Sequence, residues 1–236
     1  MTAVFQQALS GLLVVDKSAG FTSMDVCAII RKKLRKGGAP KRVKVGHGGT
    51  LDPAATGVLV VLCGRATTMC NTIMAGEKEY LAELDLSRVS TTDDAEGVVT
   101  EIAGAREISR AEFDAAVVKF VGEIEQVPPD YSAVHVGGRR AYAMARDGEK
   151  VTLAPRRVFV KSITVTEFAW PRAKIDVVCG KGVYIRSLAR DLGRALGVGG
   201  MLTALRRTRV GEFGIDRARA LDSLPESMCQ SDLITV

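Results

Sequence analysis

The sequence has few histidines and cysteines, the residues that build zinc centres and disulfide frameworks, and it has no long apolar run. Its longest apolar run, Val58 to Cys63, is far shorter than the roughly 20 residues of a membrane-spanning helix. Two histidines and five scattered cysteines, with no C-x-x-C pair, argue against a zinc site and favour reduced thiols. The N-terminus lacks a basic segment ahead of an apolar stretch, so we expect a cytoplasmic protein without a signal peptide.

Length and composition indicate a globular protein with a substantial core. The chain has 236 residues, of which 47% are hydrophobic and 25% charged, enough for one large domain or two small ones. No repeat, low-complexity segment or shift in composition marks a linker. We therefore expect a single catalytic domain over 1–236, with the Pro-, Gly- and Arg-rich stretch 128–157 as a mobile insertion.

Apolar periodicity and turn residues predict a mixture of helices and strands without regular βα alternation. Thr22 is expected to cap a helix, and Ser109 with Glu112 forms the capping-box pattern of another. The expected helices cover 23–36, 66–74, 109–121, 140–146, 185–196 and 218–224. The expected strands cover 11–17, 43–45, 58–63, 80–86, 98–103, 131–136, 156–168 and 174–179. The pattern predicts the α+β class with a mixed, largely antiparallel central sheet.

Positive charge is concentrated in three places. No acidic residue occurs between Asp25 and Asp52, whereas eight Lys and Arg residues fall between them. Further basic clusters lie at 206–209 and 139–140, and the formal net charge is +6. A basic cluster is often only a solvated face, but three of them favour a polyanionic partner, whose phosphates would bind in a salt-dependent way.

The segment 46–57, GHGGTLDPAATG, places one carboxylate among four glycines and a proline. Glycine permits a close backbone approach or a positive φ, and Pro53 biases Asp52 toward an extended conformation. Asp52 is therefore expected to lie on a stiff corner of the chain. The alternative is an ordinary surface turn.

Two other segments carry candidate functional side chains. In 180–186, GKGVYIR, Tyr184 and Arg186 are two residues apart at a predicted strand–helix junction, so they would share a side if the chain is extended there. Tyr80 begins a predicted strand, and its ring would either pack in the core or stack on a base. Sequence distance alone does not pair Asp52 with Arg186.

Five motifs, in order along the chain, resemble the signature of the TruB family of tRNA pseudouridine-55 synthases. They are GHGGTLDPAATG preceded by DKSAGFTS, GEKEY at 76–80, VPPDYSA at 127–133 followed by GRRAY, KGVYIRSL at 181–188, and LRRT at 205–208. Two positions depart from the family pattern. Ser18 stands where proline is usual, and Thr91 where an aspartate is usual.

The resemblance implies the pseudouridine synthase fold and an enzyme that isomerises the uridine at position 55 in the TΨC loop of tRNA, without metal or cofactor. Asp52 would be the catalytic aspartate, paired with Arg186, and Tyr80 would stack on the flipped uracil and help to remove the C5 proton. The expected substrate-binding residues are His47, which would contact the T loop, Tyr184, Leu205, Lys17, Gly48 and Thr50. The expected partner is the T arm of tRNA, bound by a monomer without membrane or protein partner and without the C-terminal RNA-binding (PUA) domain of many members.

Three alternatives remain open from the sequence. The chain could act as a guide-RNA-dependent pseudouridine synthase within a ribonucleoprotein, or as a non-catalytic RNA binder or tRNA-folding chaperone. A carboxylate-dependent hydrolase is the weakest of the three, because no second carboxylate is obviously paired with Asp52.

Overall fold

The structure, a computed structural model, describes residues 9–132, 134–149 and 151–236. The chain folds into two compact units. The first unit takes in the chain up to Lys78 and again from Arg206 to Val236, and the second is Glu79–Leu205. The expectation of one domain over 1–236 stays a prediction.

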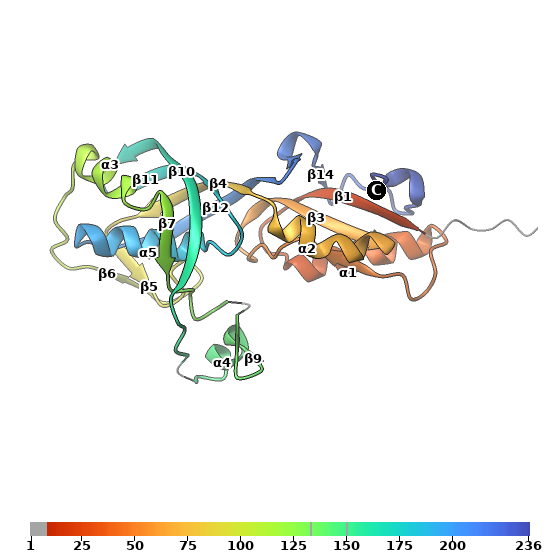
Figure 1. The fold of residues 1–236 in the computed structure, drawn as a ribbon, viewed down its shortest axis with the longest axis horizontal. Helices are drawn as coiled ribbons and strands as arrows, with labels where there is room; N and C mark the ends of the chain where they lie inside the picture. Colours follow the sequence, from red (N-terminus) through yellow and green to blue (C-terminus); the bar gives the residue numbers. More distant parts are fainter. Residues whose placement is uncertain (1–8, 133, 150) are drawn as a thin grey trace, which may run out of the picture. The chain divides into compact units, whose positions relative to one another are not determined.

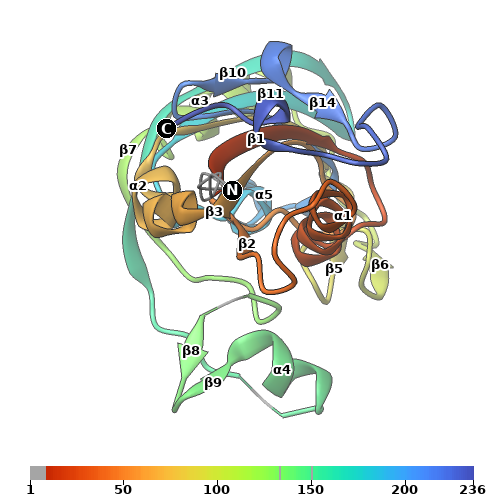
Figure 2. The same cartoon turned by 90° about the vertical axis from the view of Figure 1, so that its right-hand side faces the viewer.

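The first unit is built on a small mixed sheet with the strand order β14-β1-β3-β12 (Figures 1 and 2). β1 is antiparallel to β3 over its whole length, β2 adds to β3 antiparallel, and the middle of β12 pairs with β3 in parallel. Its elements are β1 (Ser10–Lys17), α1 (Ser23–Lys36), β2 (Val45–His47), β3 (Thr56–Gly64), η1 (Arg65–Met69), α2 (Cys70–Ala75), β13 (Phe213–Gly214), η2 (Ile215–Arg217), β14 (Arg219–Ala220) and η3 (Gln230–Asp232). The unit boundary falls within β4 (Lys78–Asp85) and β12 (Met201–Val210).

Both faces of β1 and β3 are buried, which explains why these strands are almost continuously apolar. Leu13 and Val15 face one apolar cluster together with Ile30 of α1. Leu12 and Val14 face a second cluster on the other side of the sheet. Neither face is left for solvent, so the two strands form the rigid centre of the unit.

Helix α1 begins and ends where the sequence predicts. Thr22 Oγ1 accepts from the Asp25 amide at 3.1 Å, and Asp25 Oδ2 accepts from the Thr22 amide at 2.9 Å, which completes a capping box. Val26, Ile30 and Leu34, spaced four residues apart, are fully buried. The cap and the spacing of the apolar residues, both local signals, therefore predict this helix correctly.

The second unit contains a sheet with the strand order β12-β4-β11-β10-β7 and two separate hairpins, β5–β6 and β8–β9 (Figure 1). β10 is antiparallel to both β11 and β7. The elements are β4, β5 (Arg88–Ser90), β6 (Val99–Glu101), α3 (Arg110–Val118), β7 (Gly122–Gln126), β8 (His135–Val136), β9 (Arg139–Arg140), α4 (Ala141–Arg146), β10 (Arg156–Ala169), β11 (Arg172–Cys179) and α5 (Ile185–Leu196). The mixed, largely antiparallel α+β architecture predicted from the sequence is confirmed.

Helix α5 supplies much of the core of the second unit. Ile185, Leu188 and Leu192 are buried, and α5 contacts α3, whose Phe113 stacks on Phe168 with ring centroids 5.2 Å apart. The segment with β8, β9 and α4 stands away from the sheet of this unit in both views (Figures 1 and 2). The predicted insertion 128–157 contains these three elements.

Two expected elements are wrong, and five strands, β5, β7, β9, β12 and β13, were missed. The expected strand 131–136 is reduced to His135–Val136, because the Tyr131 and Ser132 carbonyls bond elsewhere, to Arg186 and the Tyr142 amide. The expected helix 218–224 is instead the short strand β14, which pairs in parallel with β1. β7 and β12 were missed because their many charged residues do not fit the usual composition of a strand.

The packing around Gly57 generates a prediction about stability. Gly57 has φ +101°, and a Cβ there would collide with the Arg207 backbone. Gly104 has φ +70° but open space around it. We expect Gly104→Ala to cost about 1 kcal/mol through the left-handed backbone alone, and Gly57→Ala to cost about 3 kcal/mol because β3 and β12 must also separate. Urea unfolding measures both, and equal losses would contradict the close approach.

Candidate active site

Asp52 lies in the first unit, in the connection between β2 and β3, and is half-buried. The hydroxyl of Ser23 holds the preceding residue, Leu51, through both its backbone amide and its backbone carbonyl. Ser23 Oγ accepts from the Leu51 amide at 2.9 Å and donates to the Leu51 carbonyl at 3.0 Å. Ser23 is the first residue of α1 and is buried, so the helix itself positions the approach to Asp52.

The residue after Asp52 is held by Lys17, whose side chain is fully buried. Its ammonium donates to the carbonyls of Pro53 at 3.1 Å, Phe21 at 2.8 Å and Ser18 at 3.0 Å. The Gly20 amide also donates to the Pro53 carbonyl at 2.9 Å. Lys17 thus supports the turn from inside the protein, and its expected contact with substrate stays a prediction.

A third anchor is Arg207, which is only 2% exposed. Its guanidinium donates to the carbonyls of Val58 at 2.8 Å, Thr50 at 3.1 Å and Gly49 at 3.1 Å. The sequence places Arg207 in a cluster expected to contact polyanions, and burial corrects that expectation for this residue. Its fork of donors instead satisfies backbone carbonyls, two of which, those of Gly49 and Thr50, lie outside the strands.

The other predicted residues of the first unit surround this turn. His47 ends β2, and its carbonyl accepts from Cys70 Sγ at 3.3 Å. Gly48 is buried, and a Cβ there would collide with Ile73. Thr50 is exposed. The structure therefore brings the residues predicted in this part of the chain, His47, Gly48, Thr50 and Lys17, to one turn with Asp52.

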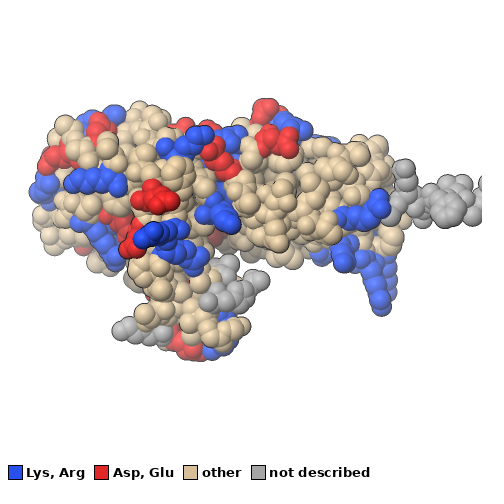
Figure 3. All heavy atoms as spheres, viewed as in Figure 1, with Lys and Arg blue, Asp and Glu red and all other residues tan. Residues whose placement is uncertain are grey.

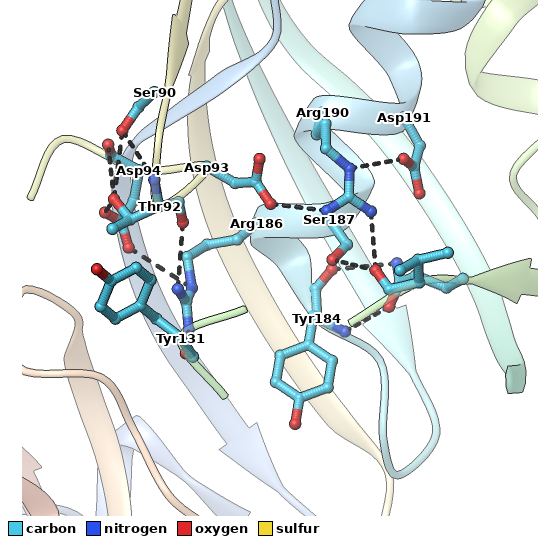
Figure 4. A network of polar contacts seen from close by, with 12 residues as sticks. Ser90, Thr92, Asp93, Asp94, Tyr131, Tyr184, Arg186, Ser187, Arg190 and Asp191 are labelled. Atoms are coloured by element: carbon cyan, nitrogen blue, oxygen red, sulfur yellow. Dashed lines mark hydrogen bonds and ion pairs between the residues drawn. The ribbon is translucent and has the colours of Figure 1, made fainter. Parts of the chain in front are cut away.

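In the second unit, Gln126 fixes the backbone of Tyr184 at the start of α5. Gln126 Oε1 accepts from the Tyr184 amide at 2.8 Å, and Nε2 donates to the Tyr184 carbonyl at 3.1 Å. Gln126 is only 1% exposed. In Figure 4 the Tyr184 ring extends away from Ser187 and Arg190, so the backbone is clamped while the phenol points elsewhere.

Arg186 is buried among groups of its own unit (Figure 4). Its Nη atoms donate to the carbonyls of Thr92 at 3.2 Å and Tyr131 at 2.9 Å, and Nε lies 3.5 Å from Asp94 Oδ2. Asp94 Oδ1 is in turn bonded by Thr92 Oγ1 at 2.5 Å. Asp94 is therefore one carboxylate beside Arg186, and the Asp52–Arg186 pair stays a prediction.

One helical turn further along α5, Arg190 makes a second set of contacts. Its guanidinium donates to Asp93 Oδ2 at 2.8 Å, Asp191 Oδ1 at 3.0 Å and the Val127 carbonyl at 2.8 Å. Burial raises the pKa of the Asp93 carboxyl, and the neighbouring Arg190 charge opposes that shift. Ser187 Oγ donates to the same Val127 carbonyl at 2.8 Å.

The remaining predicted residues of the second unit are Tyr80 and Leu205. Tyr80 lies on β4 and is 9% exposed, whereas Leu205 lies on β12 and is half-buried. Tyr80, Tyr184, Arg186 and Leu205 thus belong to one unit, and Asp52 and His47 to the other. Their assembly into one site stays a prediction.

Several residues that hold the site were not predicted from the sequence. They are Ser23, Arg207, Gln126, Asp93, Asp94 and Arg190. In the loop 91–97, the comparison with the TruB pattern singles out only Thr91, where an aspartate is usual. The structure shows instead that the neighbouring Asp93 and Asp94 contact Arg190 and Arg186. Nothing in the spacing of Gln126 or Ser23 indicates a long-range contact to a backbone group.

Most of the basic window before Asp52 does lie on the surface. Its exposed members are Lys32, Arg35, Lys36, Lys41, Arg42 and Lys44. Of the window's other two, Arg31 donates to the Val45 carbonyl and Lys33 to the Leu224 and Pro225 carbonyls, and exposed Lys36 pairs with Glu226. Lys and Arg side chains gather at the lower right of Figure 3, where Figure 1 draws the loop after α1. We call Lys41, Arg42 and Lys44 the basic loop.

Across residues 9–132, 134–149 and 151–236, no group of three or more His, Cys, Asp or Glu side chains is arranged to hold a metal ion. Within the same residues, no helix has the length and apolar character needed to cross a membrane.

Comparisons with known proteins match nearly the whole chain. Residues 33–185 match the family model of the N-terminal domain of TruB family pseudouridylate synthases, and residues 186–232 match that of the tRNA pseudouridylate synthase B C-terminal domain. The tRNA pseudouridine synthase B of Streptomyces griseus is 45% identical over 227 residues, covering 92% of this chain and 74% of that protein. The protein of the same name from Nocardia farcinica is 49% identical over 222 residues, covering 92% and 71%.

Two solved structures of multi-component complexes also contain a chain that is similar to this protein. A chain in a crystal structure of a Cbf5-Nop10-Gar1 complex superposes with a TM-score of 0.70 at 32% identity, covering 91% of this chain and 53% of that one. A chain in an H/ACA RNP bound to a substrate RNA containing 2′-deoxyuridine gives a TM-score of 0.66 at 30% identity, covering 91% and 52%. This chain thus spans about half the length of those solved chains.

The contacts of Arg207 generate a second prediction. Arg207→Lys keeps the charge but cannot present a fork of donors to three carbonyls, so we expect a loss of about 2–4 kcal/mol in the free energy of unfolding. Arg206→Lys is the matched control, because Arg206 makes a half-exposed ion pair with Asp16 at 2.7 Å that lysine can replace. Hydrogen exchange should accelerate at residues 49–51 only in Arg207→Lys. Equal behaviour of the two variants would remove Arg207 as an anchor of the turn.

Proposed function

This chain belongs to the TruB family of pseudouridylate synthases, and we propose that it converts uridine 55 in the TΨC loop of tRNA into pseudouridine with Asp52 as the catalytic carboxylate. In this reaction the uracil detaches from C1′, rotates and rejoins through C5, so the substrate is isomerised. The 45% and 49% identities to proteins named tRNA pseudouridine synthase B support the choice of substrate.

The observation that carries the proposal is the fixed backbone around Asp52. Leu51 and Pro53, on either side of the aspartate, are held by Ser23 and Lys17. Arg207 holds Gly49 and Thr50 just before them. A carboxylate that attacks a nucleoside or assists glycosidic cleavage benefits from such preorganisation, because no free energy is then lost in ordering it during the reaction.

The second unit is proposed to supply the groups that bind the base. Tyr80 stacks on the flipped uracil and helps to remove the C5 proton, Tyr184 lines the pocket, and Arg186 pairs with the Asp52 side chain. Flipping costs a few kcal/mol, and stacking on an aromatic ring returns about 1–3 kcal/mol. His47 contacts the T loop, and Leu205 packs in the pocket wall.

The basic loop is proposed to bind tRNA phosphates. Lys41, Arg42 and Lys44 are exposed and lie a few residues before His47 along the chain. The backbone that carries them is tied down, because the Val43 amide donates to the Pro40 carbonyl and the Gly64 amide to the Lys44 carbonyl. Phosphate contacts from such a surface add affinity that does not depend on sequence.

A guide-RNA-dependent reaction is the second candidate, and the likeness to chains of the Cbf5-Nop10-Gar1 complex and of the H/ACA RNP bound to substrate RNA favours it. Identity to these chains is 32% and 30%, against 45–49% to the tRNA enzymes, which favours the first candidate. Incubation of the purified protein with an unmodified tRNA transcript separates them. Pseudouridine at position 55 without added RNA or protein supports the first candidate, whereas pseudouridine that forms only after a guide RNA is added supports the second.

We expect Asp52→Asn to abolish pseudouridine formation while tRNA affinity changes by less than about threefold, because the amide keeps the shape but cannot act as a carboxylate nucleophile. Asp222→Asn, at an exposed acid of the same unit, is the control and should retain activity. Single-turnover assays with saturating enzyme give the rate, and filter binding gives the affinity. Turnover of Asp52→Asn near the unsubstituted rate would refute the catalytic assignment.

Neutralising the basic loop should weaken binding and leave chemistry intact. For Lys41→Gln/Arg42→Gln/Lys44→Gln, we expect the slope of log Kd against log salt to fall by about 2–3, since each phosphate contact contributes about 0.7–0.9. The control, Arg106→Gln/Arg110→Gln/Lys119→Gln, removes the same charge from the region of α3. If both triple variants change the slope equally, net charge rather than the basic loop governs binding.

A further inference from the structure

Two consecutive aspartates in the turn 91–97 contact two different arginines of α5 (Figure 4). Asp94 pairs with Arg186, and Asp93 pairs with Arg190 one helical turn later. The proposed reaction uses Arg186 but gives no role to Arg190. The Asp93–Arg190 pair therefore needs its own explanation.

Arg190 is more than an ion-pair partner. While one nitrogen binds Asp93 at 2.8 Å, another donates to the Val127 carbonyl at 2.8 Å. Ser187 Oγ donates to that same carbonyl. Val127 is followed by two buried prolines, Pro128 and Pro129, so these contacts hold the chain where the segment 128–157 begins.

The turn that carries Asp93 is itself fixed. The Asp93 carbonyl accepts from the Leu202 amide at 3.0 Å, and Asp94 forms a parallel bridge with Leu202 of β12. Asp93 has φ +61°, a left-handed conformation that non-glycine residues adopt at a cost. A cost of this kind persists where surrounding contacts impose it, and it often marks a functional position.

The burial of the pair distinguishes it from ordinary surface pairs. The side chains of Arg190 and Asp93 are 13% and 16% exposed. In the Arg110–Asp114 pair of the same unit, with the same 2.8 Å distance, they are 50% and 44% exposed. Exposed pairs contribute little, whereas breaking a buried pair leaves a charge without compensation.

We propose that Asp93 and Arg190 are a positioning pair, which holds Val127, and with it the start of the segment 128–157, against α5. By fixing this part of the chain, the pair strengthens tRNA binding. Asp93 orients the guanidinium, and the guanidinium holds Val127. Tyr131, four residues further on, then keeps its carbonyl at Arg186. The effect of the pair on tRNA binding rests on the proposed function, whereas its effect on the order of residues 127–132 does not.

The test uses Asp93→Asn, because asparagine tolerates the left-handed backbone and keeps the shape of aspartate while it removes the charge. Asp114→Asn, in the exposed pair, is the matched control. In Asp93→Asn we expect amide exchange at Val127 and at 130–132 to accelerate at least about tenfold, with β1 and β3 unchanged. We expect the KM for tRNA to rise about five- to tenfold and kcat to change less than about twofold.

A second variant keeps the proposal testable if Asp93→Asn fails to fold. Arg190→Lys retains the ion pair with Asp93 but cannot also reach Val127 with a second nitrogen, so it should give the same exchange at 127–132. The double variant should add little to either single change, because both break one linkage.

The outcomes separate this inference from the proposed function. Exchange at 127–132 that matches Asp114→Asn, or a fall in kcat with unchanged KM, would overturn the positioning role. Accelerated exchange in a protein whose unsubstituted form does not modify tRNA would uphold the structural linkage and refute the proposed substrate.

Discussion

The structure around Asp52 depends on buried side-chain donors that bind backbone carbonyls. The stretch from Gly48 to Ala55 lies outside helices and strands, so its carbonyls lack the partners that regular structure provides. Each buried carbonyl without a donor would cost free energy. Lys17 and Arg207 carry the donors inside, at 0% and 2% exposure. The desolvation of these two charges is compensated by six charge-assisted hydrogen bonds. Three of these bonds go to carbonyls of the turn, those of Gly49, Thr50 and Pro53.

In the second unit, polar side chains likewise bind backbone groups near the start of α5. Gln126, Ser187 and the two arginines hold backbone groups of Tyr184, Val127 and Tyr131. In both units, therefore, irregular segments that carry candidate functional groups are held by polar side chains of neighbouring regular elements. The helix or strand supplies the rigidity of the site, and the irregular segment supplies a backbone geometry that regular structure does not allow.

What the sequence predicts well is local. The ends of α1 follow from Thr22, Asp25 and the buried spacing that begins at Val26, all within one or two helical turns of one another. The Asp52 turn is predictable as a stiff corner for the same reason. The strand β12 cannot be predicted in this way, because its run of arginines and threonines resembles a surface segment. Its place in the sheet depends on pairing with β3, about 150 residues away in the chain, and residue spacing carries no information about such contacts.

The basic residues illustrate the limit of reading charge from a sequence. Arg206, Arg207 and Arg209 form a compact cluster, yet one is buried against carbonyls and two form ion pairs with Asp16 and Glu77. Lys41, Arg42 and Lys44 form a similar cluster and are exposed. The difference arises from the backbone. The strand β12 turns the neighbouring side chains of Arg206 and Arg207 toward opposite faces, and only Arg207 faces the core. A loop imposes no such alternation, so hydration keeps all of its charges outside.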